Sequence, residues 1–335
     1  MRIHHLVLTS RFAGSERYAL ELAQAQAASG HEVTLVLRGA ALGQRADSLA
    51  SRLPDGVRVA VVPDWFSAWH ARRLLRRERP DAAHAHLSAA CKALAGIAGM
   101  ARAATLHIAY KPRQHAHLDG VVAITPGQLA ALPATLRERS VHIDNWTQLK
   151  EAAADSRERL RASLGVAADV VLLGTLGRVE SSKGHDLLLE AFKDAGFGKQ
   201  VQLVVVGGGS ALQALRRSSP PGVHPVGFSD EPSGWLQAMD GFVSAARSEP
   251  FGLVFLEAME AGLPILATDT EGGRHLAALF GRPLVPVGDV PALRDALRNF
   301  VDSGLVRRDY PMARFRLDDK LPTFDAFYRG LRADA

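Results

Sequence analysis

The sequence of 335 residues has one cysteine, Cys91, and no long hydrophobic run. A single cysteine can form neither an intramolecular disulfide nor a cluster of thiolate metal ligands, which favours a reducing compartment. We expect Cys91 to fill space in a core. No apolar run approaches the roughly 20 residues of a membrane-spanning helix, and the run at residues 6–8 is too short for a signal peptide. We therefore expect a cytoplasmic protein.

Several nucleotide- and metal-binding motifs are missing as well. No Gly-x-x-x-x-Gly-Lys-Ser/Thr sequence occurs, which disfavours a P-loop ATPase, and no Asp-x-Asp pair of metal ligands occurs. The glycines at 207–209 lack the later glycine of a dinucleotide fingerprint, so we interpret them mainly as a turn that ends a strand. Gly14 either lets a phosphate approach the backbone or forms a tight turn.

The composition does supply a large core and a basic surface. Hydrophobic residues make up 47% of the chain, whose length is sufficient for two domains of ordinary size. The net charge of +5 indicates an anionic partner, such as nucleic acid, nucleotide phosphates or an acidic membrane surface. No nucleic-acid recognition motif accompanies this charge, so we expect no nucleic-acid partner.

Short apolar runs alternate with helical patterns, which is typical of βα units in doubly wound parallel sheets. In the first half, a helix is predicted at 15–29 and strands at residues 3–9, 32–37, 57–62, 82–86, 104–108 and 121–125. The polar, weakly periodic segment 148–161 is interpreted as a linker. Further strands are predicted at residues 170–176, 202–206, 223–226, 241–245 and 264–267. Helical spacing at 324–331 predicts a last helix that packs back across the domain boundary.

Two carboxylates, Glu249 and Glu257, lie eight residues apart around a Pro-Phe-Gly turn. Pro250 biases Glu249 toward an extended backbone, so a helix is predicted to begin near Phe251 or Gly252. The unpaired N–H groups at such a helix start suit a phosphate, and the carboxylates can accept hydrogen bonds from the hydroxyls of a sugar phosphate or ribose. Taken alone, two glutamates are more often a solvated loop acid and an ordinary helix acid.

Two cations, Arg178 and Lys183, follow the predicted strand at 170–176, at the edge where open α/β sheets bind ligands. Arginine engages phosphate through two donors and lysine acts as a point charge, so the pair can clamp a diphosphate and stabilise a departing nucleotide. The alternative is a pair of solvated loop cations.

A basic segment at 64–79 is predicted to be helical, with Ala68, Ala71 and Leu75 as a narrow buried stripe. The other side chains that define it are Trp65, Trp69, Arg72, Arg73, Arg76 and Arg77. Such a face suits anionic lipid headgroups or a phosphorylated glycolipid acceptor. The alternative is a solvated basic helix whose tryptophans pack on a neighbour.

Together these residues resemble family 4 of the retaining, nucleotide-sugar-dependent glycosyltransferases, which have the GT-B architecture. In the first half the resemblance is carried by Gly14-Ser15-Glu16, Gly30-His31-Glu32-Val33, Thr105-Leu106-His107 and Asp144-Asn145. In the second half it is carried by Gly177-Arg178 through Lys183-Gly184, the glycines 207–209, the Glu249-to-Glu257 segment, Ala261-Gly262-Leu263-Pro264 and Gly272-Gly273. The glutamate pair with its Pro-Phe-Gly-Leu insert is the specific part.

The resemblance implies an α/β protein with two Rossmann-like, doubly wound domains that face each other across a cleft. Residues 1–150 would form the acceptor domain, 151–315 the nucleotide-sugar donor domain, and 316–335 a C-terminal helix packing back across the boundary. The implied catalytic residues are Arg178, Lys183, His107 and Glu249. The implied donor-binding residues are Gly14, Glu249, Phe251, Gly252, Leu253, Glu257, Gly227 and Phe228.

By the same resemblance, Glu257 would bind the ribose, Glu249 the hydroxyls of the donor sugar, and His107 would lie beside the transferred sugar. The implied reaction moves a hexosyl unit, with retention, from a nucleotide-diphosphate sugar to a glycan or glycolipid acceptor in cell-envelope polysaccharide or lipopolysaccharide synthesis. Cations and a helix dipole would replace a metal, and no cofactor is expected. The protein would be cytoplasmic, or peripheral on the inner face of the cytoplasmic membrane.

Two other kinds of protein share this scaffold. One is a catalytically silent GT-B protein that binds a nucleotide sugar or serves as a partner subunit, although retention of Glu249, Glu257, Arg178 and Lys183 argues against it. The other is a GT-B epimerase or sugar phosphorylase. UDP, GDP and ADP donors all remain open, as do the sugar and the acceptor.

Overall fold

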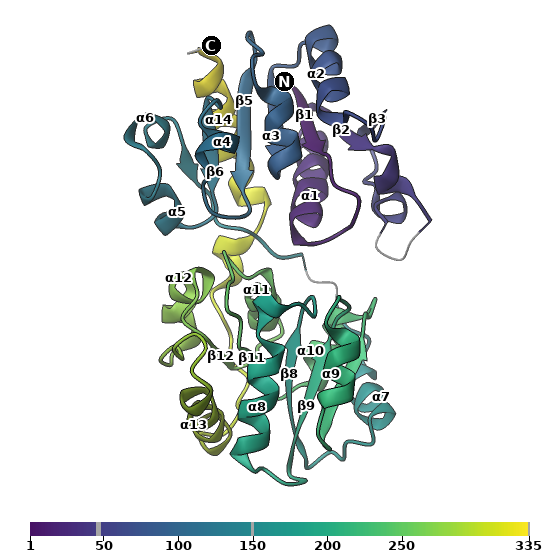
Figure 1. Cartoon of the computed structure of the whole chain (residues 1–335), viewed down its shortest axis with the longest axis vertical. Helices are drawn as coiled ribbons and strands as arrows, with labels where there is room; N and C mark the ends of the chain where they lie inside the picture. The colour runs from purple at the N-terminus through teal and green to yellow at the C-terminus, as the bar shows by residue number, and fades with distance from the viewer. Residues whose placement is uncertain (45–47, 149–150, 334–335) are drawn as a thin grey trace. The chain divides into compact units, whose positions relative to one another are not determined.

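A computed structural model describes residues 1–44, 48–148 and 151–333 of the chain (Figure 1). The chain forms two compact units. The first consists of Met1–Asn145 together with Arg316–Ala335, and the second is Trp146–Phe315. Among the described residues, no helix is both long and apolar enough to cross a membrane.

The first unit contains a seven-stranded parallel sheet in the order β3-β2-β1-β4-β5-β6-β7. The strands are β1 (Arg2–Val7), β2 (Glu32–Arg38), β3 (Arg58–Val62), β4 (Ala82–His86), β5 (Ala101–Leu106), β6 (Gly120–Ala123) and β7 (Val141–His142). The direction of winding reverses at β1, as in a doubly wound sheet. All six predicted strands are present, and β5 begins three residues earlier than predicted. The two-residue β7 is too short to produce a recognisable apolar run.

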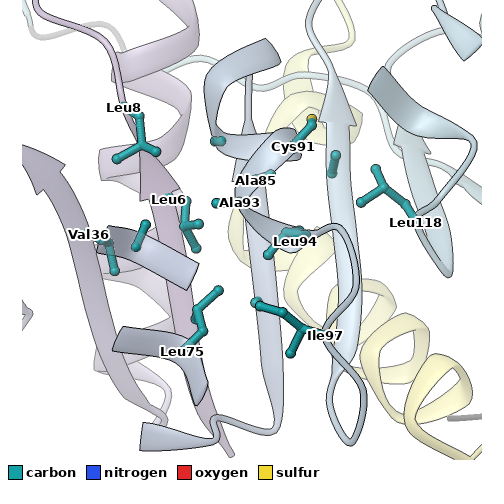
Figure 2. Close-up of a cluster of buried hydrophobic side chains, with 14 of the residues drawn as sticks. Leu6, Leu8, Val36, Leu75, Ala85, Cys91, Ala93, Leu94, Ile97 and Leu118 are labelled. Carbon is teal, nitrogen blue, oxygen red and sulfur yellow. The ribbon is translucent and has the colours of Figure 1, made fainter. Parts of the chain in front are cut away.

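Helices cover both faces of this sheet. They are α1 (Gly14–Ala28), α2 (Ser67–Glu78), α3 (Ser88–Leu94), α4 (Pro112–His115), α5 (Pro126–Ala130), α6 (Ala134–Arg137) and α14 (Leu321–Ala333). One face packs Leu6 and Ala85 against Leu75 of α2 and Leu94 of α3 (Figure 2). Cys91 is buried in this cluster, which confirms that it fills space in a core. Burial also raises the pKa of its thiol to about 12.

The opposite face carries α1 and the C-terminal helix α14, drawn in yellow beside β5 (Figure 1). Tyr18, Leu22 and Gln26 of α1 recur every four residues and are buried. Phe324 and Tyr328 of α14 are also buried, with at most 1% of each side chain exposed. The last helix of the chain is therefore an integral layer of the first unit.

The second unit contains a five-stranded parallel sheet in the order β10-β9-β8-β11-β12. The strands are β8 (Val171–Leu176), β9 (Val201–Val206), β10 (Val223–Gly227), β11 (Gly241–Ser244) and β12 (Ile265–Ala267). The helices are α7 (Ser156–Ser163), α8 (His185–Ala195), α9 (Leu212–Ser218), α10 (Pro232–Ala238), α11 (Leu253–Glu260), α12 (Glu271–Phe280) and α13 (Val290–Asp302). All five predicted strands are present, with ends within one residue of the prediction.

The predicted linker at 148–161 is wrong from Ser156 onward, which is half of its described length. Residues 149–150 lie outside the described part of the chain, but Ser156–Ser163 forms α7, which packs against α10. Arg157 and Arg161 of this helix both pair with Asp240, at 2.5 and 3.1 Å. The arginines of this segment bind a carboxylate within the second unit. In the sequence, such a polar helix resembles a linker.

Candidate functional site

The helix that carries Glu257 begins at Leu253, one residue beyond the predicted start. Gly252 precedes it with φ +87°, and a Cβ at this position would lie 2.3 Å from Cδ2 of Phe255. Both the left-handed backbone and the lack of space require glycine here. Glu257 lies on the second turn, as predicted, and is 5% exposed. The turn therefore presents the backbone N–H groups of the α11 N-terminus beside two buried carboxylates.

Lys183 and Glu249 are in direct contact although 66 residues separate them. The Nζ atom of Lys183 donates to Oε2 of Glu249 at 2.5 Å. Lys183 ends the short 3-10 helix η3 (Ser181–Lys183) after β8, and Glu249 follows β11, the neighbouring strand of the sheet. The structure thus joins the predicted diphosphate cation and the predicted sugar-binding carboxylate at the carboxyl edge of two adjacent strands.

The loops that carry this pair are locked together through their backbones. The carbonyl of Ser182 accepts hydrogen bonds from the N–H groups of Arg247 and Ser248, at 2.8 and 3.2 Å. Gly184 has φ +64°, and a Cβ on it would lie 2.0 Å from the carbonyl oxygen of Ala245. Such close approach fixes the position of Lys183 relative to the loop after β11.

Glu249 is also held from the other side by α12. Its carbonyl accepts a hydrogen bond from the N–H of Gly272 at 2.8 Å. A Cβ on Gly272 would lie 2.2 Å from the carbonyl oxygen of Phe251, so the first turn of α12 lies against the Pro-Phe-Gly turn. Phe251 itself is buried. The buried Glu249 carboxylate consequently has a rigid backbone on both sides.

Arg178 occupies the same loop as Lys183 but has a different partner. Its Nη1 atom donates to Oε1 of Glu180 at 2.8 Å, and 60% of its side chain is exposed. The structure therefore does not join Arg178 to Glu249.

Gly227 is the last residue of β10 and Phe228 follows it, so both predicted donor-binding residues lie beside the glycine turn 207–209. The N–H of Gly207 donates to the carbonyl of Gly227 at 2.7 Å. A Cβ on Gly207 would lie 1.7 Å from the carbonyl oxygen of Gly177, which confirms the interpretation of these glycines as a tightly packed turn. Phe228 is 59% exposed, so a large aromatic face is free beside this turn.

Gly14 and His107 lie in the first unit. Gly14 is the first residue of α1. His107 follows β5, is partly exposed, and places its ring edge-on to Tyr18 with centroids 4.9 Å apart. Burial lowers the pKa of His107 to about 3, so its imidazole is neutral at neutral pH.

Helix α2 buries two of the three residues of the predicted stripe. Ala71 and Leu75 are fully buried, whereas Ala68 is only partly buried against the same core. Trp65 and Trp69 are 84% and 54% exposed, so the alternative that they pack on a neighbour is wrong. Phe66, which the sequence analysis did not name, adopts a left-handed backbone with φ 53° and is 80% exposed.

Two of the four arginines of α2 have hydrogen-bond partners within the first unit. Arg72 donates to the carbonyls of Lys92 and Ala93, and Arg76 donates to that of Gly96. Both guanidinium groups thus satisfy carbonyls at and beyond the end of α3, where a helix leaves acceptors unpaired. The two remaining cations are exposed: Arg73 lies 5.9 Å from the ring of Trp69, and Arg77 pairs with Glu78.

Comparison with known proteins assigns the chain to a family. Residues 12–143 match the family model Glycosyltransferase Family 4, and residues 170–303 match the model Glycosyl transferases group 1. The fold is therefore GT-B, and the class of protein is glycosyltransferase. The chain belongs to glycosyltransferase family 4, as the sequence predicted.

Similar proteins extend over the full length of the chain. The lipopolysaccharide core biosynthesis glycosyltransferase LpsD of Rhizobium meliloti (strain 1021) is 25% identical over 352 residues, which cover 99% of each chain. HepE of Anabaena, solved in complex with UDP and glucose, has a TM-score of 0.72 at 20% identity and covers 90% of each chain. WaaG, a glycosyltransferase involved in lipopolysaccharide biosynthesis, has a TM-score of 0.70 at 17% identity, covering 99% of this chain and 94% of WaaG.

Proposed function

We propose that the chain is a retaining glycosyltransferase that moves a hexosyl unit from a nucleotide-diphosphate sugar to a glycan or glycolipid acceptor. The observation that carries this proposal is the contact of Lys183 with the buried Glu249 at the N-terminal end of α11. A nucleotide sugar joins a diphosphate directly to a ring of hydroxyls. A cation and a hydrogen-bond acceptor side by side match that pair of groups.

In the proposed reaction, the bond between the anomeric carbon and the diphosphate oxygen breaks while a bond to the acceptor oxygen forms on the same face. The proton of the acceptor hydroxyl passes to the departing diphosphate. Lys183 and Arg178 balance the charge that develops there, together with the N–H groups at the start of α11. Glu249 holds the sugar hydroxyls and Glu257 the ribose. This arrangement supplies the charge balance from the protein, so we propose that no metal is required.

The donor and acceptor are proposed from the relatives. HepE is solved with UDP and glucose, which supports a UDP-sugar donor, and the exposed Phe228 offers a face on which a base can stack. LpsD and WaaG both act in lipopolysaccharide biosynthesis, which supports a lipopolysaccharide or related cell-envelope acceptor.

We expect the protein to release nucleoside diphosphate from one nucleotide sugar only when a suitable acceptor is present. The assay compares UDP-, GDP- and ADP-sugars, with and without lipopolysaccharide core acceptors, and NMR of the product gives the anomeric configuration. Transfer with retention that persists in EDTA supports the proposal. Binding of the donor without turnover identifies a silent binding protein, inverted product contradicts retention, and release of sugar phosphate identifies a phosphorylase.

We further propose that the first unit rests on an anionic membrane through the start of α2, on the cytoplasmic side where nucleotide sugars are made. Trp65, Phe66 and Trp69 are all more than half exposed, and Arg73 and Arg77 follow them on the helix. Aromatic side chains with adjacent cations favour the headgroup region of a bilayer, where each cation contributes about 1 kcal/mol. A glycolipid acceptor would be met at the same surface.

Replacing Trp65, Phe66 and Trp69 with serine should lower binding to vesicles that contain anionic lipid by roughly tenfold or more, because three exposed aromatic side chains no longer insert. Co-sedimentation with vesicles of phosphatidylglycerol and phosphatidylcholine measures the effect. The matched control is Val306→Ser, an equally exposed apolar residue of the second unit, at 75% exposure. Unchanged co-sedimentation of the triple variant would refute membrane association through α2.

A further inference from the structure

Four histidines line one face of the first sheet. His5 is on β1, His84 and His86 are on β4, and His107 follows β5. The strand register pairs His5 with His84 and His86 with Thr105, so the side chains lie on neighbouring strands. Because residues two apart on a strand share a face, His84 and His86 lie on the same side of the sheet. That side is covered by α1 and α14.

Three of these imidazoles and one amide form a continuous hydrogen-bonded path. Oε1 of Gln26 lies 2.7 Å from Nε2 of His5, and Nδ1 of His5 lies 3.1 Å from Nε2 of His86. Nδ1 of His86 lies 3.1 Å from Nε2 of His107. Gln26, His5 and His86 are at most 1% exposed, whereas His107 reaches the partly exposed carboxyl edge of the sheet.

The direction of the protons in this path follows from its inner end. Burial lowers the pKa of His5 to about 4 and that of His86 well below its ordinary value, so both imidazoles are neutral and carry one proton each. Since the amide oxygen of Gln26 only accepts, His5 donates from Nε2 and accepts at Nδ1. His86 must then donate from Nε2 to His5 and accept at Nδ1, which leaves His107 donating from Nε2.

A buried metal ion would be another use for His5, His84 and His86, whose nearest ligand atoms lie within 4.8 Å of one another. The rings of His84 and His86 are parallel within 7°, with centroids 4.7 Å apart, so their lone pairs cannot converge on one ion. His84 is instead engaged at both nitrogens, by Tyr328 at 2.6 Å and Thr105 at 2.8 Å. The geometry favours hydrogen bonding over metal binding.

We propose that Gln26, His5 and His86 are positioning residues that fix His107 in the tautomer protonated at Nε2 and present its Nδ1 lone pair at the carboxyl edge of the sheet. Among the described residues, none hydrogen bonds to this Nδ1 atom. It is therefore available to accept a hydrogen bond from a substrate hydroxyl. This inference rests on the proposed function in one respect: the hydroxyl that binds Nδ1 of His107 would belong to the transferred sugar or to the acceptor.

The tautomer can be measured without any activity assay. In protein labelled with ¹⁵N-histidine, we expect the His107 proton on Nε2 and a coupling across the hydrogen bond between Nε2 of His107 and Nδ1 of His86. His5→Phe should mix the two tautomers of His107, because His86 then has no acceptor for its Nε2 proton. His84→Phe is the matched control, since it removes a buried histidine of the same face outside the path. A His107 proton on Nδ1 in the unmodified protein, an unchanged tautomer in His5→Phe, or stoichiometric bound zinc would overturn the proposal.

The kinetic test replaces Gln26 at the buried inner end of the path. Gln26→Met should lower turnover by roughly tenfold with little change in the donor KM, and should have no further effect in a His107→Ala background. A general loss of packing would instead lower turnover in both backgrounds, which would contradict a role through His107. Gln24→Met makes the same substitution on the exposed face of α1 and should leave turnover unchanged. If the unmodified chain shows no transfer, the proposed function fails, while the NMR measurement still decides the tautomer.

Discussion

Replacing Lys183 with alanine should lower turnover by roughly tenfold or more while the fold stays intact, because a well-placed cation is lost from the site of the departing diphosphate. Lys183 lies at the carboxyl edge of the sheet, and the backbone contacts of Ser182 and Gly184 hold it there. Steady-state release of nucleoside diphosphate at saturating donor measures the effect. The matched control is Lys193→Ala, an exposed lysine on α8 of the same unit.

A second consequence separates catalysis from stability. Removing Lys183 leaves the Glu249 carboxylate, which is 8% exposed, without its cation. Leaving a buried charged group unpaired costs about 1–3 kcal/mol, so Lys183→Ala should also lower the free energy of unfolding. Adding Glu249→Gln should restore part of that stability but not the turnover. Near-normal turnover of Lys183→Ala at saturating donor would refute the role of Lys183.

The variant Gly184→Ala should lower the free energy of unfolding by about 3 kcal/mol or more, since two penalties combine at this position. The residue has φ +64°, which disfavours an L side chain, and its new Cβ would lie 2.0 Å from the carbonyl oxygen of Ala245. A backbone oxygen cannot rotate away as a side chain does, so η3 must shift. Lys183 would then lose its contact with Glu249, and turnover should fall with stability.

Gly165→Ala isolates the backbone penalty. Gly165 has φ +68°, but no atom lies within 4 Å of a Cβ built on it. We expect this control to cost about 1–2 kcal/mol, the penalty of a left-handed backbone alone. Urea denaturation of the two variants measures the difference. Equal destabilisation would show that the approach of Gly184 to Ala245 imposes no steric cost.

Much of the fold is predictable because apolar periodicity is a local property. All eleven predicted strands are present, and the pattern after Pro250 predicts α11 to within one residue of its start. The failures have physical causes. Helix α7 is polar because Arg157 and Arg161 pair with Asp240, and β7 has two residues and no pattern of its own.

The candidate site is only partly predictable, because contacts between distant residues leave no local pattern in the sequence. The residue types and motif spacing predict Glu249, Glu257 and Lys183 as site residues, but they do not show that Lys183 contacts Glu249. The sequence also does not distinguish Arg72 and Arg76 from Arg73 and Arg77. They differ because the end of α3 lies within reach of two of the four side chains.

Local sequence is thus sufficient for eleven of the twelve described strands, the start of α11, the glycine turns and the family. Pairing across distance depends on strand order and register, which bring β8 beside β11 and β1 beside β4. Those neighbours create the Lys183–Glu249 contact and the path from Gln26 to His107, between residues that no local pattern connects. The chemistry of single residues can be read along the chain, whereas their partners are set by the packing of the sheets.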